Sequence, residues 1–478
     1  MKARIFSFSA LVALLAMIVF TAMPVRAESV DDKIKAVEEE LARLKAEQEQ
    51  VKNEQMALKK QATEAAAALP TFSYRAGSGI LMEAADKSWS LRFLNRFHYW
   101  LLFRDGEADT RGGLGELFAR RIRPTFFYCV NNCFYETEVS FDLDSTDAVS
   151  LQRAATFIHF EQINPWLPTF YFGIDSPTAW ARRRSSSSGA QLDYDILSRS
   201  NGFNTGSQGW NYALLWEDKP LAGIGAIEWF TIAVGAGPGA AGDGGFVFSD
   251  RKDYVTSIAI SPFSQLKNKW LRGLELSSGV WFCNFDNNVG GEKQNCDDAP
   301  IRETDGPERA TIWDANVDNT GTGDGTHHFI QNGLRWRIGP YQLLANIGFQ
   351  RYEGSSIRHR NWFIGHELYV WSPKGFLTGS ASTPGSILLG THFERSDGRC
   401  GNGACENDGQ YNDNHMTMNS VGLYYFIQRG IRVGVHWNHY RAPNITSDVQ
   451  EELSIRDVGV PGRGGSWDNV FVVFGWEF

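Results

Sequence analysis

The feature that most constrains this chain is an alternation of apolar and polar residues that recurs over most of its length after the first 70 residues. Within residues 89–104, for example, Tyr99 and Leu101 fall on one face of an extended chain, and Arg96 and His98 fall on the other. This period of two is typical of β-strands with one apolar and one polar face. Aromatic residues gather near the ends of such segments, as they do in the interfacial girdles of membrane barrels, so the pattern predicts a sheet with its apolar face toward lipid.

Sixteen segments of this kind are expected to form strands. They lie near residues 89–103, 115–128, 134–144, 151–162, 168–175, 209–217, 225–236, 253–262, 271–284, 328–338, 341–351, 361–371, 386–394, 417–427, 430–441 and 468–478. The predicted fold class is all-β: a sixteen-stranded antiparallel transmembrane β-barrel, preceded by a signal peptide and a short α-helical coiled coil.

The joints between these segments alternate in length. Joints after even-numbered segments are mostly short and include 129–133, 163–167, 218–224, Gly339-Pro340 and Gln428-Arg429, whereas joints after odd-numbered segments include the long stretches 176–208, 285–327, 395–416 and 442–467. Short turns at one end and long loops at the other are typical of outer-membrane barrels, and an even strand number places both chain ends on the periplasmic side. A soluble sandwich has no reason to sort its loops in this way. The joint 371–386 is too long for the pattern and leaves room for a missed strand.

The last segment carries the clearest alternation. Val470, Val472, Phe474, Trp476 and Phe478 form its apolar face. Terminal alternation that ends in Phe resembles the C-terminal strand of bacterial outer-membrane barrels, which the assembly machinery of those proteins recognises. The bacterial outer membrane is therefore the expected location.

Residues 1–27 have the layout of a secretory signal peptide. A basic start, an uncharged apolar run over residues 5–20 and small residues at Val25 and Ala27 are the three parts of such a signal. An uncleaved membrane anchor is the alternative, although the apolar run is short for one. Secretion would place the chain in an oxidising compartment, where disulfides persist.

Residues 28–70 are expected to form a periplasmic helix within a coiled coil. The heptad stripe of this helix consists of Val30, Ile34, Val37, Leu41, Leu44, Gln48, Val51, Gln55, Leu58, Ala62, Ala65 and Leu69. These positions alternate at spacings of four and three, which is the a/d pattern of a coiled coil. A lone helix cannot bury such a stripe, so the stripe predicts association with copies of itself, as a dimer or a trimer. The alternative is a single helix that lies on its own barrel.

Composition excludes several classes of protein. Hydrophobic residues make up 42% of the chain and charged residues 21%, a balance that excludes a disordered chain. After residue 27 the sequence lacks the long uninterrupted apolar stretches of a helical membrane protein. The net charge of −9 makes the chain a poor candidate for binding nucleic acid.

The six cysteines fall into three local pairs: Cys129/Cys133, Cys283/Cys296 and Cys400/Cys405. The first pair flanks a tight turn, and the other two lie at or within long joints. Local pairs in a secreted chain are expected to form disulfides that hold loops together. Additional His or Cys residues do not stand at ligand spacing near any pair, so no metal site is predicted.

A signal peptide, a heptad helix and a sixteen-strand barrel, in that order, resemble the phosphate-selective porin O and P family. Three segments carry the resemblance. Residues 118–123 are similar to the paired-arginine strand of that family, and residues 388–396 are similar to its late strand before a long loop. Residues 421–426, with Arg432 and Val433, are similar to its penultimate hairpin. The resemblance spans most of the chain and implies a trimeric channel that passes anions. Arginines that line the pore determine anion choice in that family, and Arg120 and Arg121 match its motif.

Strand parity selects residues for a pore wall without reference to any family. If the apolar faces meet lipid, the opposite faces meet water. The predicted pore-lining, anion-binding residues on strands are Arg92, Arg96, Arg121, Arg123, Arg335, Arg337 and Arg432, and the same parity turns Glu136, Glu138, Asp142, Asp144, Glu275 and Glu367 inward. The lumen is therefore expected to contain both basic and acidic strands. By its place in the alternation, Arg120 falls on the apolar face of its strand. Its side chain is therefore expected to extend to the membrane interface, or the residue marks a β-bulge.

The long joint after the fifth strand adds Arg182, Arg183 and Arg184, followed by a run of serines. In sixteen-strand porins the loop at this place folds into the channel and narrows it. Guanidinium and hydroxyl groups there would replace part of the hydration of a passing phosphate or carboxylate. The alternatives are a solvated surface loop and a basic patch that binds lipopolysaccharide phosphates.

The predicted function is that of an outer-membrane porin for passive diffusion of small polar solutes, with a preference for anions such as phosphate. Expected partners are those solutes, outer-membrane lipid and lipopolysaccharide, and other copies of the chain in a homotrimer. The leading alternative is a structural barrel that sheathes a multihaem cytochrome in an electron conduit. A further alternative is an adhesin or a barrel enzyme, although no Ser/His/Asp constellation stands out. No catalytic residue, metal or cofactor is predicted, and the expected domains are 1–27, 28–70 and 71–478.

Overall fold

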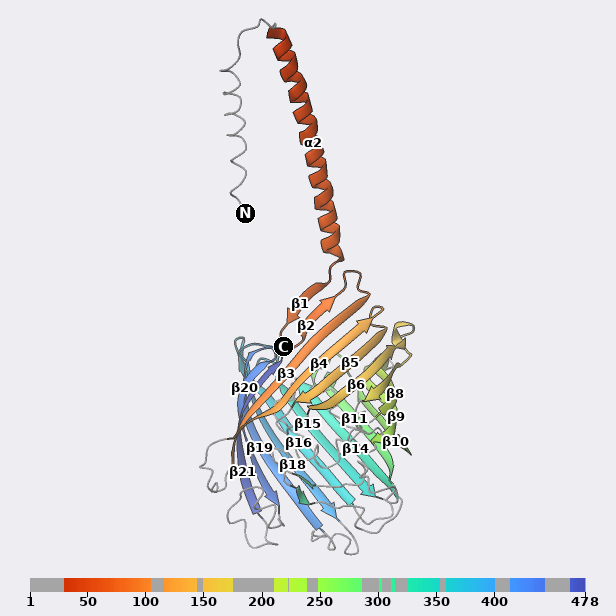
Figure 1. Cartoon of the computed structure of the whole chain (residues 1–478). Helices are drawn as coiled ribbons and strands as arrows, with labels where there is room; N and C mark the ends of the chain where they lie inside the picture. Colours follow the sequence, from red (N-terminus) through yellow and green to blue (C-terminus); the bar gives the residue numbers. More distant parts are fainter. Residues whose placement is uncertain are drawn as a thin grey trace. The chain divides into compact units, whose positions relative to one another are not determined.

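The computed structural model describes residues 30–104, 116–143, 149–174, 210–221, 223–238, 248–285, 301–302, 311–313, 325–352, 358–399, 413–442 and 465–477. The chain divides into two compact units, Met1–Leu69 and Pro70–Phe478. The first unit contains helix α2 (Val30–Ala68), and the second contains the main sheet (Figure 1). The signal peptide predicted for residues 1–27 lies outside the described residues.

Helix α2 is 39 residues long and has Asp31 and Asp32 in its first turn, where the helix dipole favours negative charge. Arg43 forms an ion pair with Glu47, one turn further on, at 3.1 Å. In the single chain the apolar heptad side chains are between 51% and 65% exposed, as seen at Ile34, Val37, Leu41, Leu44, Val51 and Leu58. Packing against another helix would bury such a stripe. Among the described residues, no helix has the length and apolar character needed to cross a bilayer.

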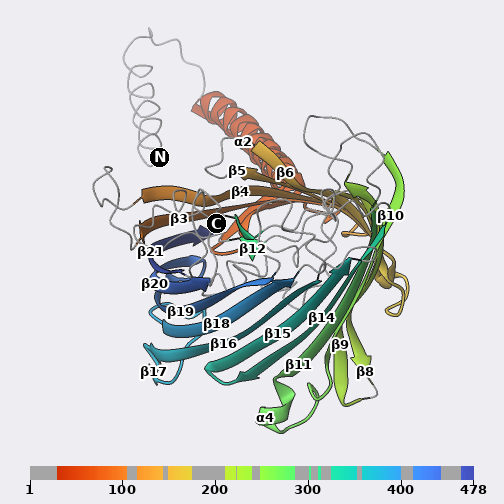
Figure 2. The same ribbon diagram turned by 90° about the horizontal axis from the view of Figure 1, so that it is seen from below.

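The second unit is built around a 19-stranded antiparallel sheet, of which sixteen long strands form a ring. These strands are β3 (Trp89–Arg104), β4 (Glu116–Val130), β5 (Tyr135–Leu143), β6 (Val149–His159), β7 (Thr169–Ile174), β8 (Trp210–Leu221), β9 (Gly225–Pro238), β10 (Phe248–Ser261), β11 (Leu274–Phe285), β14 (Gly325–Ile338), β15 (Tyr341–Tyr352), β16 (Arg358–Ser372), β18 (Ile387–Arg399), β19 (Asp413–Gln428), β20 (Ile431–Ala442) and β21 (Gly465–Glu477). Each strand pairs with the next, and β21 pairs with β3, so the described strands close into a barrel (Figure 2). The predicted sixteen-stranded antiparallel barrel preceded by a helix is confirmed, whereas the signal peptide and the coiled-coil pairing of the helix stay predictions.

The sixteen predicted segments each overlap one strand of the ring, with ends displaced by only a few residues. The long joint 371–386 hides no further ring strand, because its residues are all described and β17 (Gly375–Phe376) only folds back on the end of β16. A second small pair, β12 (Ile301–Arg302) with β13 (Thr311–Trp313), forms a separate two-stranded sheet that sequence analysis did not predict.

The two ends of the barrel differ in their connections. At one end, which we call the short-turn rim, β4 meets β5 at residues 131–134 and β14 meets β15 at Gly339-Pro340. At the opposite end, the long-loop rim, β3 ends at Arg104 and β16 begins at Arg358. Short turns are typical of the periplasmic end of an outer-membrane barrel and long loops of its extracellular end.

Sequence analysis missed a short hairpin that precedes the ring, made of β1 (Thr71–Arg75) and β2 (Gly79–Glu83). Strand β2 pairs with the start of β3, along the same edge of β3 that pairs with β21 further on. The backbone N–H of Gly77, in the hairpin turn, donates to the carbonyl of Glu477 at 3.3 Å. The hairpin thus extends the closing seam of the barrel at the short-turn rim.

A β-bulge in β4 explains the paired arginines of that strand. The register between β3 and β4 shifts by one residue at Arg120. A bulge lets residues on both sides of it turn to the same face, and both Phe118 and Arg121 are buried, at 7% and 2% exposure. Of the two expectations for Arg120, the bulge is the one that the strand register shows.

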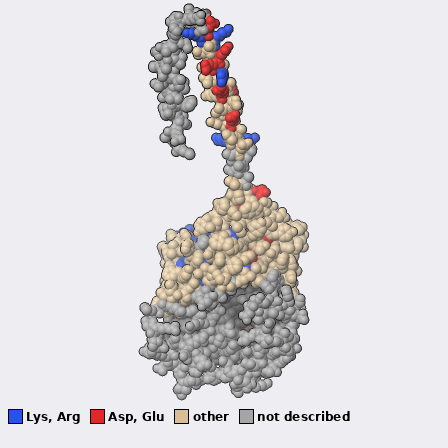
Figure 3. Space-filling view, viewed as in Figure 1, with Lys and Arg blue, Asp and Glu red and all other residues tan. Residues whose placement is uncertain are grey.

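The outer face of the ring carries large apolar side chains. Exposed examples from around the barrel are Tyr99, Phe103, Phe126, Tyr128, Phe172, Tyr212, Ile232, Tyr254, Phe282, Ile330, Phe349, Ile364, Leu389, Leu423, Tyr425, Trp437, Phe474 and Trp476. Where the structure describes this face, Figure 3 shows only scattered charged atoms on it. An apolar surface of this extent is unfavourable in water and typical of contact with lipid.

The inner face carries buried polar side chains together with aromatic rings. Along β16, His359 and Glu367 are buried while Ile364, of opposite parity, is exposed. Glycine allows an aromatic ring to lie close against this wall, because a Cβ at Gly434 would stand 2.2 Å from the ring of Tyr424. The barrel therefore places most of its buried polar and charged groups on the inner wall, among aromatic rings such as Trp229, Trp281 and Phe329, and keeps its outer wall largely apolar.

Cys129 and Cys133 form a disulfide across the turn between β4 and β5. Asn131, Asn132 and Cys133 have φ angles of 54°, 54° and 62°, so the bridge closes a tight left-handed turn. Cys283 lies in β11, whereas Cys296, Cys400 and Cys405 lie outside the described residues. The second and third disulfides stay predictions.

Replacing Gly434 with Val is expected to destabilise the barrel by about 1–3 kcal/mol, because the Tyr424 ring must leave its place on the wall. The measurement is the temperature at which the folded band on an unheated gel converts to the unfolded one. The double variant Gly434→Val/Tyr424→Ala removes the clashing ring and should recover part of the loss. Equal destabilisation in both variants would contradict this steric explanation.

Candidate functional site: the inner wall of the barrel

The inner wall near the short-turn rim holds a chain of charged and polar side chains on four neighbouring strands. Arg335 on β14 forms an ion pair with Glu275, directly opposite on β11, and both side chains are nearly buried. Arg337 donates to Gln342 on β15 at 2.8 Å, and Gln342 donates to Glu367 on β16 at 3.0 Å. Cross-strand partners fix these side chains, so their charges have defined positions on the wall.

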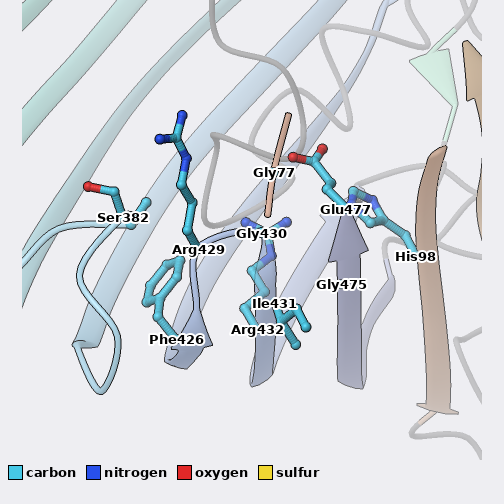
Figure 4. A pocket seen from close by; sticks show the side chains of 11 residues that line it. Gly77, His98, Ser382, Phe426, Arg429, Gly430, Ile431, Arg432, Gly475 and Glu477 are labelled. Atoms are coloured by element: carbon cyan, nitrogen blue, oxygen red, sulfur yellow. The ribbon is translucent and has the colours of Figure 1, made fainter. Parts of the chain in front are cut away.

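A second ion pair lies at the seam that closes the ring. Arg96 on β3 donates to Glu477 on β21 at 2.5 Å, with side-chain exposures of 16% and 15%. A cavity of about 280 Å³ lies beside the seam at the short-turn rim, and His98, Arg429, Arg432 and Glu477 are among its lining residues (Figure 4). Two arginines, one glutamate and one histidine line the cavity, so it is polar and of mixed charge.

Arg432 lies against the wall rather than across the lumen. Its guanidinium stands 5.6 Å from the centre of the Tyr424 ring, a cation–π distance. The Tyr424 hydroxyl is hydrogen bonded to Nδ1 of His436 at 2.9 Å. Gly475 leaves room for this arrangement, since a Cβ there would lie 3.2 Å from Cγ of Arg432.

The arginines predicted on β3 and β4 also have inward parity. Arg121 is buried and Arg123 partly buried on β4. The Arg92 guanidinium lies 4.1 Å above the ring of Phe127, its cross-strand neighbour. The seven strand arginines predicted to line the pore are thus all on the inner parity, whereas Arg182, Arg183 and Arg184 lie outside the described residues.

Several inner-wall groups were missed by sequence analysis. On β16 and β18, the His359 Nε2 is 2.6 Å from the Ser396 hydroxyl, and Asn361 donates to Glu394 at 2.9 Å. Glu394 also lies 3.2 Å from His392. Strand parity could have placed these residues inward, because they alternate with Phe393 and Arg395, but the pairing across two strands required the register. Ser396 and His359 are 0% and 2% exposed, which suits a structural hydrogen bond.

Charges of opposite sign lie on adjacent strands. Arg153 on β6 donates to Glu138 on β5 at 2.7 Å, another pair that was missed because only its acidic member was predicted. Lys219 on β8 is also buried on the inward parity. The expected mixture of basic and acidic strands therefore includes local pairs that join adjacent strands.

At the short-turn rim a small hydrogen-bonded group lies outside the spanning strands. Glu161, in the short helix η1 (Phe160–Gln162), accepts from Thr169 at 2.8 Å and lies 2.7 Å from His159. Partial burial raises the pKa of the Glu161 carboxyl, but hydrogen bonds from its own backbone, His159 and Thr169 outweigh this effect and lower the pKa below its usual value. The carboxyl therefore stays ionised at neutral pH and holds the turn between β6 and β7.

No known protein family and no curated protein match this chain. Its strand arrangement is similar to solved outer-membrane channels. OmpF of Salmonella typhi in complex with daunomycin matches at 11% identity and a TM-score of 0.49, covering 85% of this chain and 100% of that one. The outer membrane channel DcaP of Acinetobacter baumannii matches at 10% identity and a TM-score of 0.48, covering 82% and 98%. The anion-selective porin from Comamonas acidovorans matches at 10% identity and a TM-score of 0.47, covering 82% and 100%.

The closed ring and its reversed polarity define the class of protein. The fold is that of an outer-membrane β-barrel, and it is established by the strand pairing of the chain itself rather than by these distant likenesses. A closed barrel with polar residues on its inner wall and apolar residues on its outer wall belongs in the outer membrane.

Replacing Glu275 with Gln is expected to lower the free energy of unfolding by about 3 kcal/mol, because the nearly buried Arg335 loses its counter-charge. Urea unfolding in detergent micelles, followed by tryptophan fluorescence, measures the loss. The double variant Glu275→Leu/Arg335→Met removes both charges and should be closer to wild type than the single variant. A single variant as stable as wild type would show that the pair contributes nothing to the barrel.

Proposed function

We propose that this chain is an outer-membrane porin that lets small polar solutes diffuse down their gradients. The observation that carries the proposal is the reversed polarity of a closed sixteen-strand ring, with charged side chains on the inner wall and an apolar belt outside. Steric exclusion and fixed wall charges would select among solutes. The proposal assigns no chemical step to the protein.

We further propose a preference for anions. The support is the number of arginines on the inner parity, among them Arg121, Arg123 and Arg432, of which Arg121 and Arg432 are buried in the wall. The triplet Arg182–Arg184 is proposed to add a guanidinium cluster near the narrowing of the channel. The resemblance to the phosphate-selective porin O and P family supports phosphate as a candidate solute.

The purified protein is expected to form open channels in a planar bilayer and to pass chloride more readily than potassium. Replacing Arg182, Arg183 and Arg184 together with Ala should shift the reversal potential in a KCl gradient toward cation preference, because cationic side chains leave the channel. Phosphate added to one side should compete with chloride current in the wild type and less so in the variant.

A matched control removes three exposed cations from the short-turn rim, with Lys267, Lys269 and Arg272 replaced by Gln. This control should keep the wild-type reversal potential. An unchanged potential in the Arg182–Arg184 variant would place those residues outside the conduction path. If the purified protein conducts no ions and a haem protein copurifies with it, the porin proposal is overturned in favour of a structural barrel that sheathes a cytochrome.

We propose that three copies assemble, with their α2 helices in a coiled coil. The support is the exposed heptad stripe of α2, which includes Ile34, Leu41 and Leu58. A homotrimer with a parallel helical bundle would bury the three stripes together. The barrel is a separate compact unit, so it does not need the helix in order to form its own ring.

Deletion of residues 30–69 is expected to leave a folded barrel but to weaken the oligomer on unheated gels. A second variant that replaces Leu41 and Leu44 with Asp tests the same stripe without shortening the chain, because charge at a and d positions opposes helix association. The matched control replaces Glu40 and Arg43, on the polar face, with Ala. An oligomer that survives both the deletion and the Asp variant would place its stability in the barrel.

A further inference from the structure

Arginines cluster on the outer face of the barrel at the long-loop rim. Arg351 on β15 lies directly opposite Arg358 on β16, and Arg358 lies directly opposite Arg399 on β18. Arg360 and Arg395 lie on the same outer face, one and two steps closer to the middle of the barrel. We call these five residues the rim arginine patch.

The patch places like charges against one another. Two cations directly opposite on neighbouring strands destabilise a sheet. Asp397 offsets part of this repulsion, because it accepts from Arg360 at 2.9 Å and from Arg395 at 2.7 Å. On β19 the register places Asp413 opposite Arg399. The five guanidinium groups outnumber these two acidic positions, so the patch itself carries a net positive charge.

The patch stands at the border of the apolar belt. Phe349 pairs in register with Ile330 on one side and Arg360 on the other. One step further from the rim, Ile347 pairs with Trp362, whose ring packs against that of Phe393 at 5.0 Å between centroids. Aromatic and cationic side chains at such a border lie at the depth of lipid headgroups.

A groove of about 660 Å³ lies within the patch. Ile330 and Phe349 line its apolar part, and Arg351, Arg358 and Arg360 line its cationic part, with Arg399 and Asp397 also present. Side chains of Arg351, Arg358 and Arg360 are exposed. An apolar surface next to several guanidinium groups is complementary to a molecule with an acyl chain and a phosphate.

We propose that the rim arginine patch binds the phosphate groups of a phosphorylated glycolipid in the outer leaflet. One guanidinium group can donate two parallel N–H groups to two oxygens of the same phosphate. A phosphate between Arg351 and Arg358 would replace the repulsion between these two residues with attraction to a shared anion. The inference rests on the outer-membrane location and is independent of conduction, because the patch lies on the face opposite to the channel.

The test uses the full-length protein reconstituted in phosphatidylcholine nanodiscs that contain a small fraction of bis-phosphorylated lipid A. Native mass spectrometry counts the lipid A that stays bound. The variant Arg351→Gln/Arg358→Gln/Arg399→Gln should lose at least about tenfold in apparent affinity, because each arginine adds its own attraction to an anionic lipid headgroup. The single variant Arg358→Gln, at the centre of the row, should lose less but in the same direction.

Two matched controls identify the cause. Replacing Lys267, Lys269 and Arg272 with Gln removes the same number of cations from the opposite rim and should leave lipid A binding unchanged. Lipid A from which the phosphates have been removed should bind the wild type as weakly as lipid A binds the triple variant. Equal retention of lipid A by the wild type and the triple variant, or equal binding of the dephosphorylated lipid, would overturn the proposal.

Competition with inorganic phosphate distinguishes a site for lipid-borne phosphate from a site for free phosphate. A lipid site should release lipid A only at phosphate concentrations far above those of the lipid, since the free anion lacks an acyl chain for the groove beside Phe349. Displacement at equal concentration would assign the patch to free phosphate instead and would overturn the lipid proposal. Single-channel conductance of the triple variant should match the wild type, which keeps this outcome distinct from failure of the porin function.

Discussion

A sheet that crosses a bilayer cannot leave an open edge, because lipid offers no partners to unpaired N–H and C=O groups. In this chain the pairing of β21 with β3 removes that edge, from Asn469 opposite Arg104 to Glu477 opposite Arg96. Once the ring is closed, successive side chains of a strand point alternately toward the lipid and toward the lumen. The apolar belt faces lipid and the paired charges of the inner wall face the lumen, while the rim arginine patch lies on the outer face at the edge of the belt, so the closure of the backbone assigns each strand position to one of two faces.

Inside the barrel, charge is arranged by neighbouring strands rather than by separate walls. Arg335 with Glu275, Arg153 with Glu138 and Arg96 with Glu477 each join two adjacent strands. Near the short-turn rim a hydrogen-bonded relay through Gln342 extends this arrangement to Glu367. Fixed pairs of this kind give the charges on the wall defined positions.

Much of the fold follows from period-two alternation in the sequence. All sixteen ring strands were predicted near their observed positions, because a face that meets lipid tolerates few exceptions and the pattern repeats in every strand. Parity likewise placed Arg335 and Glu275 on one wall. What parity cannot supply is register, so the partnership of His359 with Ser396 was not foreseen, although both residues alternate correctly.

Short elements and local irregularities were harder to predict. The hairpin formed by β1 and β2 has only five residues in each strand, too few for alternation to stand out. The sequence could not decide whether Arg120 reaches the membrane interface or marks a bulge. The pairing of β3 with β4 shows that Arg120 is the residue inserted in a bulge. The rim arginine patch escaped notice because its members come from three strands and only the register unites them.

The position of the closing seam has a consequence for how the protein is made. Arg96 and Glu477 stand 381 residues apart in the chain, yet they lie side by side in the finished ring. Glu477 is synthesised 381 residues after Arg96, so β3 and β21 can pair only after the chain has been made as far as β21. Until β21 pairs with β3, the apolar faces of the strands are exposed to water, so export must keep the chain from aggregating.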